Sequence, residues 1–221
     1  MQDQTFSGLR KALSVTRLES YRPNGGTDED AVANYLWNSA LCESLFPMLQ
    51  QLEVSFHNAL HTSIGKAISD ASWLSGSATW LQPREVEKIQ KARQDLIDQS
   101  QTVTEGRMVG ELSFGFWTSL TNRPYERAWP KFVKDAFPKA PSHCRNRTEV
   151  SARVNKLRKL RNAVFHHHSI WHWSDLTLHH NTGFELMDWI EPELAKLVRA
   201  TDRFPQIYAK GRAAFNDLVS N

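Results

Sequence analysis

The side chains of this sequence that are best suited to chemistry stand close together near residue 160. Arg158, Asn162 and His166 follow one another at intervals of four residues, with Arg161 between them. On a helix that turns about 100° per residue, the first three form one polar stripe, and Arg161 can reach the phosphate that His166 would approach. Imidazole can move the proton of a 2′-hydroxyl near neutral pH, a guanidinium stabilises charge on phosphoryl oxygens, and Asn162 can orient either group. These residues are therefore suited to cleaving RNA without a metal ion.

Basic residues are concentrated around this stripe. Seven basic side chains lie between residues 145 and 161 against one acid, Glu149, so this window carries +6 and the rest of the chain −3, since the whole carries +3. A phosphate-binding surface requires such a concentration of positive charge. We expect substrate to be bound by Arg153, Lys156, Arg158 and Lys159. A solvated helix face would have the same composition, and that alternative stays open.

The stripe needs a helix to carry it, and the apolar pattern predicts an all-α chain. No alternating apolar run bounded by turns indicates a strand, and no repeat of fixed period is found. The helix that carries the stripe is expected to have Thr148 as its N-cap and to end near His168. One face of this helix is apolar: Val150, Val154, Leu157, Leu160 and Val164.

A long helix is expected to begin after Thr27, whose side chain can cap it, with acids at residues 28–30 in the first turn. Its apolar positions recur with a period near 3.6 as far as Ile64, and Pro47 is expected to kink or divide it. This helix should be the centre of the bundle. Other helices are expected at 9–18, from Pro83, at 125–137, at 176–180, at 184–190 and from near Pro192 and Pro205, with an aromatic loop at 73–80.

Size and composition indicate one globular domain. The chain has 221 residues, of which 40% are hydrophobic, enough to bury a core without disulfides or metal ions. We expect a single domain over residues 1–221, with a helix and turn at 1–26 and the bundle core at 27–221. Cys42 and Cys144 match no CxxC spacing and no secretory leader is evident, so a reduced, cytoplasmic protein is expected. No window reaches the run of about eighteen apolar residues that suggests a membrane span.

A cluster of histidines allows a second interpretation of the helix end. The cluster contains His166, His167, His168 and His172. Although His168 and His172 have a spacing that suits a metal ion, no Cys pair or carboxylate at ligand spacing accompanies them. We expect neither metal nor cofactor, and histidines that face solvent. His179 and His180 are also expected on the surface.

Supporting roles are expected for His167 and for Glu53, His57 and Asn58 on the long helix. Alternatively, the three residues of the long helix lie on its surface or form hydrogen bonds between helices. Four tryptophans could stack on bases, but aromatic residues at helical spacing usually build a core, and we expect that role for them. They are Trp117, Trp129, Trp171 and Trp173.

The run RNAVFHHH at 161–168 resembles the Arg-Asn-x-x-x-His motif of HEPN domains, in particular of the Abi-like (abortive infection) family. Three further segments are similar to that family in the same order. These are YLWNSAL at 35–41 with LEVSFHNAL at 52–60, ELSFGFWTSL at 111–120, and the pair Phe137-Pro138. The resemblance covers residues 21–192.

The resemblance implies an up-and-down helical bundle with additional peripheral helices, which pairs as a homodimer and brings two Arg-His motifs into one cleft. It implies metal-independent RNA cleavage through 2′-hydroxyl attack, with His166 as general base or acid, Arg161 on the scissile phosphate and Asn162 in support. The expected partners are RNA, a second copy of the chain and a cognate antitoxin or phage-derived trigger. Growth arrest in phage defence is the role that it implies.

Two positions depart from the family pattern. His167-His168-Ser169 follow His166 where the family usually has His-Glu-Pro, and His57 stands where an arginine is common. The alternative function is a non-catalytic HEPN module that binds RNA, nucleotide or a partner protein through the same basic helix. A dimerisation domain is a third, purely structural, alternative.

Overall fold

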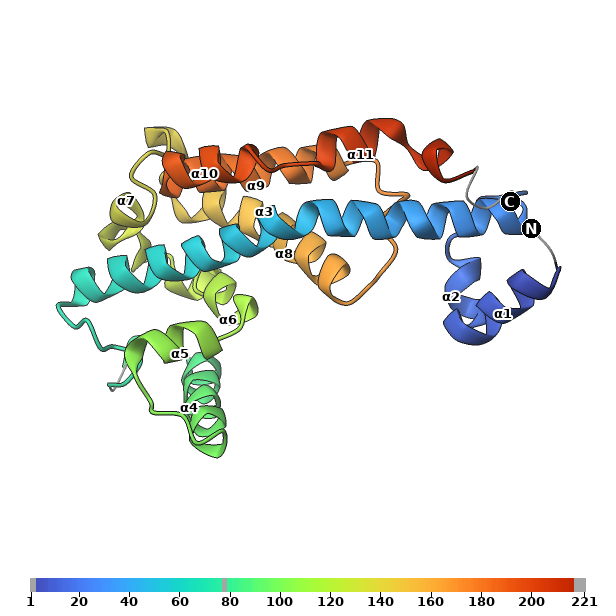
Figure 1. Cartoon of the computed structure of the whole chain (residues 1–221). Helices are drawn as coiled ribbons and strands as arrows, with labels where there is room; N and C mark the ends of the chain where they lie inside the picture. Colours follow the sequence, from blue (N-terminus) through green and yellow to red (C-terminus); the bar gives the residue numbers. More distant parts are fainter. Residues whose placement is uncertain (1–2, 77–78, 217–221) are drawn as a thin grey trace.

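The computed structural model describes residues 3–76 and 79–216, and over these residues the chain is helical and contains no strand. The prediction of an all-α chain is confirmed. One helix, α3 (Asp28–Ile68), runs the length of the molecule, and the other helices pack along it or at its two ends (Figure 1). At about 1.5 Å per residue, its 41 residues span about 60 Å.

Helix α3 begins where the sequence predicted, because Thr27 and Asp30 form a capping box. The Thr27 hydroxyl accepts from the Asp30 amide at 3.2 Å, and the Asp30 carboxylate accepts from the Thr27 amide at 3.0 Å. Pro47 lies inside the helix and does not divide it. The helix ends at Ser69, which adopts a left-handed conformation with φ 58°.

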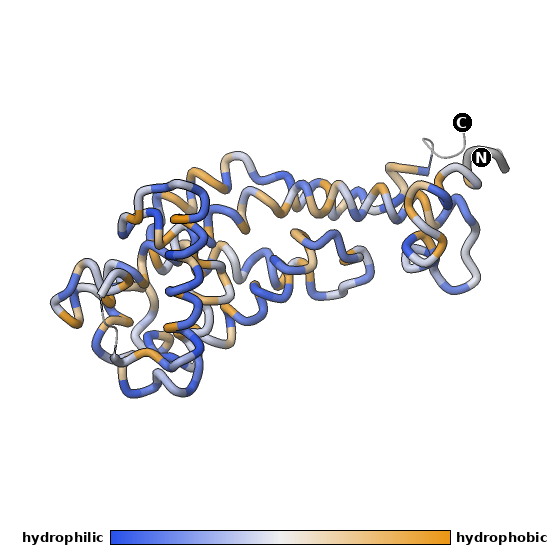
Figure 2. Tube along the Cα trace, turned by 90° about the horizontal axis from the view of Figure 1, so that it is seen from below, coloured by the Kyte–Doolittle hydropathy of each residue, from blue (hydrophilic) through white to orange (hydrophobic). Residues whose placement is uncertain are grey.

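The N-terminal segment forms two helices where one was expected. These are α1 (Asp3–Leu13) and α2 (Val15–Glu19), separated by Ser14, whose side chain accepts from the Arg17 amide and caps α2. The two helices lie against the start of α3 and share with it a small apolar cluster that is separate from the main core: Phe6, Leu18, Val32 and Ala33. Seen from below, they stand apart at one end of the molecule (Figure 2).

The other end of α3 carries α4 (Pro83–Asp98), α5 (Glu105–Glu111) and α6 (Phe114–Ser119). Helix α4 begins with Pro83 as predicted. The single helix expected at 125–137 is wrong, because the chain forms 3-10 turns at η1 (Arg123–Tyr125) and η2 (Trp129–Lys131) before α7 (Val133–Ala136). Pro124 and Pro130 each lack the amide hydrogen that a continuous helix needs, so each begins a new turn.

The C-terminal half contains η3 (Ser142–Cys144), α8 (Arg147–Phe165), α9 (Leu176–Ile190), α10 (Pro192–Arg199), α11 (Phe204–Lys210) and η4 (Arg212–Phe215). Helix α8 is capped by Asn146 rather than Thr148 and ends before His166. Residues 176–190 form one helix and not two. Helix α9 packs closely along α3, since a Cβ added at Gly183 would lie 2.3 Å from Met48 Sδ.

The core lies between α3, α6, α8 and α9. Trp117 and Trp129 are buried in it, as predicted, while Trp171 and Trp173 are half-buried at its edge. In the part of the chain that the structure describes, no helix combines the length and apolar character needed to cross a membrane.

Candidate functional site

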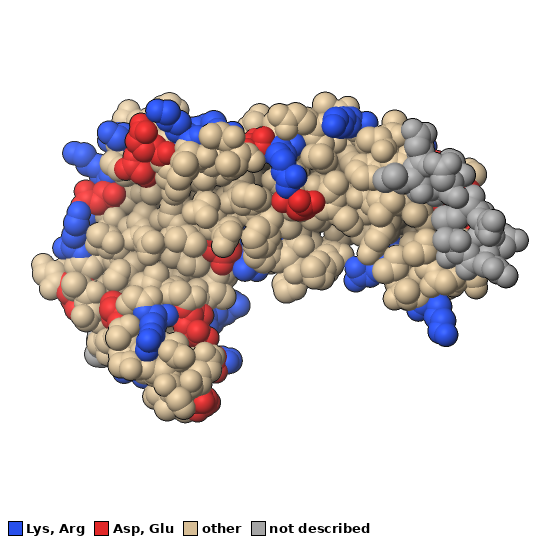
Figure 3. Space-filling model, viewed as in Figure 1, with Lys and Arg blue, Asp and Glu red and all other residues tan. Residues whose placement is uncertain are grey.

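The C-terminal end of α8 is a tight turn that exposes three histidines. His168 N donates to Ala163 O at 2.8 Å and His167 has φ 58°, so the chain reverses through the left-handed conformation that commonly ends helices. His166, His167 and His168 are all exposed. The turn projects on the side of α3 that is hollowed between the α4–α5 end and the α1–α2 end (Figures 1 and 3).

The segment after this turn is fastened to other elements. The side-chain oxygen of Asn38, which is buried in α3, accepts from the amides of Ile170 at 2.7 Å and Trp171 at 3.1 Å. Arg17 of α2 donates to His167 O at 3.2 Å. The position of the histidine turn therefore depends on both α3 and α2. Neither Asn38 nor Arg17 was predicted to have this role, because both partners lie more than 130 residues away in sequence.

Arg161 is held between α8 and α3. Its Nε and Nη2 donate to the two carboxylate oxygens of Glu53, at 2.9 and 3.3 Å. Its guanidinium carbon lies 4.3 Å from the centre of the Phe165 ring, which in turn stacks on Phe46 at 5.0 Å. This two-point contact occupies one edge of the guanidinium and leaves Nη1 on the other edge.

His57 lies behind this ion pair as a neutral, buried ring. It stacks on Trp117 at 5.3 Å between ring centres, and its Nε2 is 4.0 Å from Glu53 Oε1, too far for a hydrogen bond. Among the described residues, Nε2 has no hydrogen-bond partner. Burial, and secondarily the charge of Arg161, lower the pKa of His57 to about 3. The ring therefore supports the position of Glu53 and α3 by packing and contributes no positive charge.

Other candidate residues lie away from this group. Asn58 is exposed and lines a different hollow, with Asp135 and Glu191. Arg153 is bound by Glu149 at 2.7 Å and by Glu185 at 2.9 Å, so its charge is neutralised. The structure thus brings together Glu53, His57 and Arg161, with His166 one helical turn further on, and leaves Asn58 and Arg153 elsewhere.

In the folded chain, some basic side chains of residues 145–161 are neutralised by acids or used in structural hydrogen bonds. Arg147 pairs with Glu126 from another segment, and Arg145 is occupied by the carbonyl groups of Ala140 and Pro138. Over the face seen in Figure 3, basic and acidic side chains are interspersed. Lys156 and Lys159 are exposed, Asn162 is half-buried, and Arg158 lines a small recess described below.

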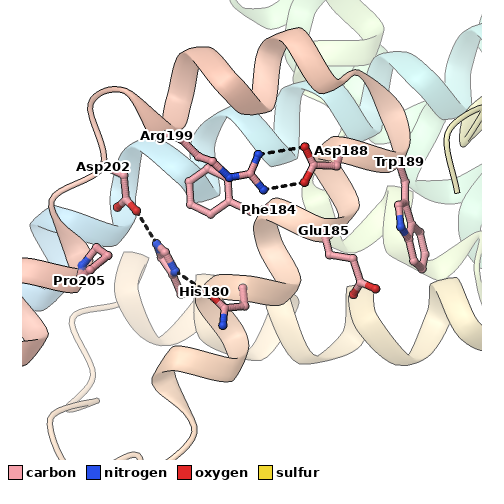
Figure 4. Close-up of a pocket in the computed structure, with 9 residues that line it drawn as sticks. His180, Phe184, Glu185, Asp188, Trp189, Arg199, Asp202 and Pro205 are labelled. Carbon is pink, nitrogen blue, oxygen red and sulfur yellow. Dashed lines mark hydrogen bonds and ion pairs between the residues drawn. The ribbon is translucent and has the colours of Figure 1, made fainter.

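The prediction that His179 and His180 lie on the surface is wrong, because both are buried in α9. His180 Nε2 is 2.8 Å from Asp202 Oδ2 (Figure 4). The His180 ring also stacks on Phe204, with 4.5 Å between the ring centres. The spacing of His180, Phe184 and Met187 is that of a buried helix face and was the signal for this placement. The pair fastens α9 to the turn before α11.

A hollow of about 560 Å³ lies beside this histidine (Figure 4). Its lining includes the carboxylates of Glu185, Asp188 and Asp202, and Arg199 is bound at 2.9 and 2.6 Å by both oxygens of Asp188. The lining has three acidic residues and one arginine, and this excess of acidic residues disfavours a phosphate. This hollow is therefore unsuited to RNA, and the end of α8 is the better candidate.

Within residues 3–76 and 79–216, no group of three or more His, Cys, Asp or Glu side chains could hold a metal ion. The rings of His166 and His168 are 6.2 Å apart and tilted. Comparison with models of protein families, with curated proteins and with solved structures found no match to this chain. Functional inference therefore rests on the chemistry of the side chains at α8.

Proposed function

We propose that the protein is a metal-independent endoribonuclease of the Abi-like HEPN type, with its site at the C-terminal end of α8. The observation that carries the proposal is that an oriented arginine is followed five residues later by an exposed histidine. Glu53 fixes Arg161 by Nε and Nη2, and His166 stands free at the helix end. Held in this way, Arg161 can present Nη1 to a phosphate oxygen without losing its structural contact.

In this mechanism a His166 imidazole accepts the proton of a 2′-hydroxyl. The 2′-oxygen attacks the adjacent phosphorus, and the bond to the 5′-oxygen breaks, giving a cyclic phosphate and a 5′-hydroxyl. The leaving oxygen needs a proton in the same step, and a second imidazolium can supply it. Arg161 stabilises charge on the non-bridging oxygens, and Asn162, one turn before His166, supports the arrangement.

The second proton donor is assigned to His166 of another copy of the chain. The end of α8 lies on the hollowed side of the molecule (Figures 1 and 3). In the proposed dimer, a two-fold axis brings the histidine turns of two copies together on this side. A homodimer therefore completes the site. Light scattering checks this, and a strict monomer that still cleaves RNA would contradict the composite cleft.

The activity is tested by incubating RNA with the purified protein in EDTA. Wild-type protein should cleave, and His166→Ala should lower the rate by about 100-fold or more. His172→Ala is the matched control, because His172 is also exposed but lies six residues beyond His166, after the histidine turn. Absence of cleavage by the wild type, or full activity of His166→Ala, would contradict the proposal.

Arg161 is best tested with lysine rather than alanine. Arg161→Ala removes the contact with Glu53 and the stacking on Phe165 together with any role in catalysis. Arg161→Lys keeps a positive charge beside Glu53 but loses the fork that leaves a second edge for phosphate. We expect a folded protein whose cleavage rate falls at least tenfold.

A second candidate is a non-catalytic HEPN module that binds RNA through α8. The pairing of Arg161 with Glu53 favours it, because the carboxylate already neutralises the arginine that would stabilise a transition state. RNA binding that weakens steeply with salt, without cleavage in any condition, would identify this function. Growth arrest through RNA cleavage and control by an antitoxin or trigger belong only to the first candidate.

A further inference from the structure

A small recess between α4, α6 and α8 is lined by basic side chains. Arg84 and Lys88 come from successive turns of α4, and Arg158 comes from α8. Neutral hydrogen-bonding groups complete the lining, among them Ser119, Asn122 and Asn155, and no described residue of the lining is acidic. The recess has a volume of about 120 Å³.

The three cations lack the counter-charges that the other arginines of this region have. Arg147, Arg153 and Arg161 are each bound by a glutamate. In the described part of the chain, no carboxylate pairs with Arg84, Lys88 or Arg158. The Nε of Arg158 is buried and has no hydrogen-bond partner among the described residues. A buried guanidinium nitrogen without an acceptor is costly, and the charge of this guanidinium adds to the positive potential of the recess.

The environment of Lys88 disfavours its positive charge. Burial, followed by the charge of Arg84, lowers the pKa of Lys88, and Arg158 acts in the same direction. The nearest acid, Glu85, opposes this shift but is buried and accepts a hydrogen bond from the Tyr125 hydroxyl at 2.9 Å. An anion in the recess would relieve the repulsion among all three cations.

We propose that this recess binds a phosphate group. Arg158, Lys88 and Arg84 would neutralise it, and the side-chain amide of Asn122 would donate to one of its oxygens. Ligand pockets for whole small molecules usually have about 300 Å³ or more, so this recess suits a phosphate and not a base or sugar. The source is either a phosphodiester of an RNA strand or a terminal phosphate.

The position of the recess gives the phosphate a relation to the end of α8. Arg158 lies two helical turns before His166 on the same stripe, about 12 Å along the axis. An RNA strand anchored by one phosphate here would extend toward His166. Phosphate binding itself does not depend on cleavage, so the inference stands or falls separately from the proposed ribonuclease.

The test compares charged residues that line the recess with an exposed lysine of α4 outside it. Lys88→Gln and Arg158→Gln remove charges of the recess, whereas Lys91→Gln removes an exposed lysine that pairs with Asp95. Inorganic phosphate is titrated into each protein by calorimetry. We expect binding by the wild type and Lys91→Gln, and at least tenfold weaker binding by the two recess variants. Without phosphate, Lys88→Gln should melt at or above the wild-type temperature, because it removes repulsion.

Two RNA oligonucleotides, with and without a 5′-phosphate, then distinguish the sources at one fixed salt concentration. An equal loss of affinity for both in Lys88→Gln assigns the recess to a backbone phosphodiester, and a loss confined to the phosphorylated strand assigns it to a terminal phosphate. The proposal is overturned if phosphate does not bind the wild type, or binds all the folded variants equally.

Discussion

Replacing Glu53 by glutamine removes the charge that holds Arg161 in place. The carboxylate and the guanidinium are joined at 2.9 and 3.3 Å, and their side chains are 17% and 22% exposed. Glutamine keeps the size of the side chain and one acceptor oxygen. The variant therefore isolates the ionic part of a contact that links α3 to α8 across 108 residues of sequence.

The partial exposure of the two side chains places the expected loss of stability in Glu53→Gln between two limits. Fully exposed pairs contribute about 0.2–1 kcal/mol, and breaking a buried pair costs about 3–5 kcal/mol. For side chains about four-fifths buried, we expect Glu53→Gln to lower the free energy of unfolding by about 2 kcal/mol. Arg161→Gln also loses stacking on Phe165, which adds about 0.5–1 kcal/mol. The double variant should cost little more than Arg161→Gln, which leaves a coupling energy of about 1–2 kcal/mol.

Urea unfolding of the four proteins of this cycle measures the coupling, provided that the slope with denaturant stays constant. Glu43→Gln is a matched control on the same helix, because Glu43 pairs with Arg203 at 2.7 Å but the two side chains are 68% and 61% exposed. It should cost less than about 1 kcal/mol. A coupling energy for Glu53 and Arg161 below about 0.5 kcal/mol, or a control as costly as Glu53→Gln, would refute the reasoning.

Three further predictions concern packing and protonation. The pKa of His57 is about 3 in the folded chain against 6.5 when unfolded, so only the unfolded state takes up the proton between these values. The contribution of neutral His57 to the free energy of unfolding is complete above pH 6.5 and is lost as pH falls, by at most about 1.4 kcal/mol per pH unit. Thermal melts at successive pH values measure this loss. Tyr125→Phe leaves the buried Glu85 carboxylate without its 2.9 Å donor and the Gln82 amide without its 3.1 Å acceptor, and should cost about 1–3 kcal/mol in urea unfolding. Gly183→Val places a branched side chain against Met48 and should cost about 1–3 kcal/mol by the same measurement.

Each of these has its own control. His57→Phe should flatten the acid slope, whereas His172→Gln should keep it, and equal slopes in both would rule out the assignment to His57. Tyr208→Phe, in a half-buried ring, should be nearly neutral, so an equal loss there would make the Glu85 contact irrelevant. Met48→Ala should rescue Gly183→Val, and additive losses would show that the close approach to Met48 is not the cause.

Three helix starts could be predicted because their signals are local, although α8 is capped by Asn146 and not by the predicted Thr148. Thr27 with Asp30, Pro83 and Pro192 each act within one helical turn, and the structure begins a helix at each. Pro130 is also a local signal, because proline interrupts a helix, but it lies inside an aromatic run for which a continuous helix was wrongly expected.

The partners of the site residues could not be predicted in the same way. Periodicity indicates which face of a helix is buried but not which residue of another helix contacts that face. The contact of Arg161 with Glu53 could therefore not be predicted from the pattern. The summed charge near residue 153 was misleading for the same reason, because Glu185 comes from α9. His180 was misplaced because a polar side chain on an apolar face needs a distant partner, Asp202, to be buried.

The separate apolar cluster under α1 and α2 bears on how the molecule opens. A unit with few buried contacts can unfold while the main core stays intact, and such sub-global openings set the rates of amide hydrogen exchange. Arg17 of this unit donates to the His167 carbonyl, so each opening would also remove one of the contacts that hold the turn that carries His166. Native-state exchange should therefore show the amides of His167 and His168 opening together with α2, well before those in the middle of α8. The histidine turn would then open in the same sub-global unfolding as α2, before the main core unfolds.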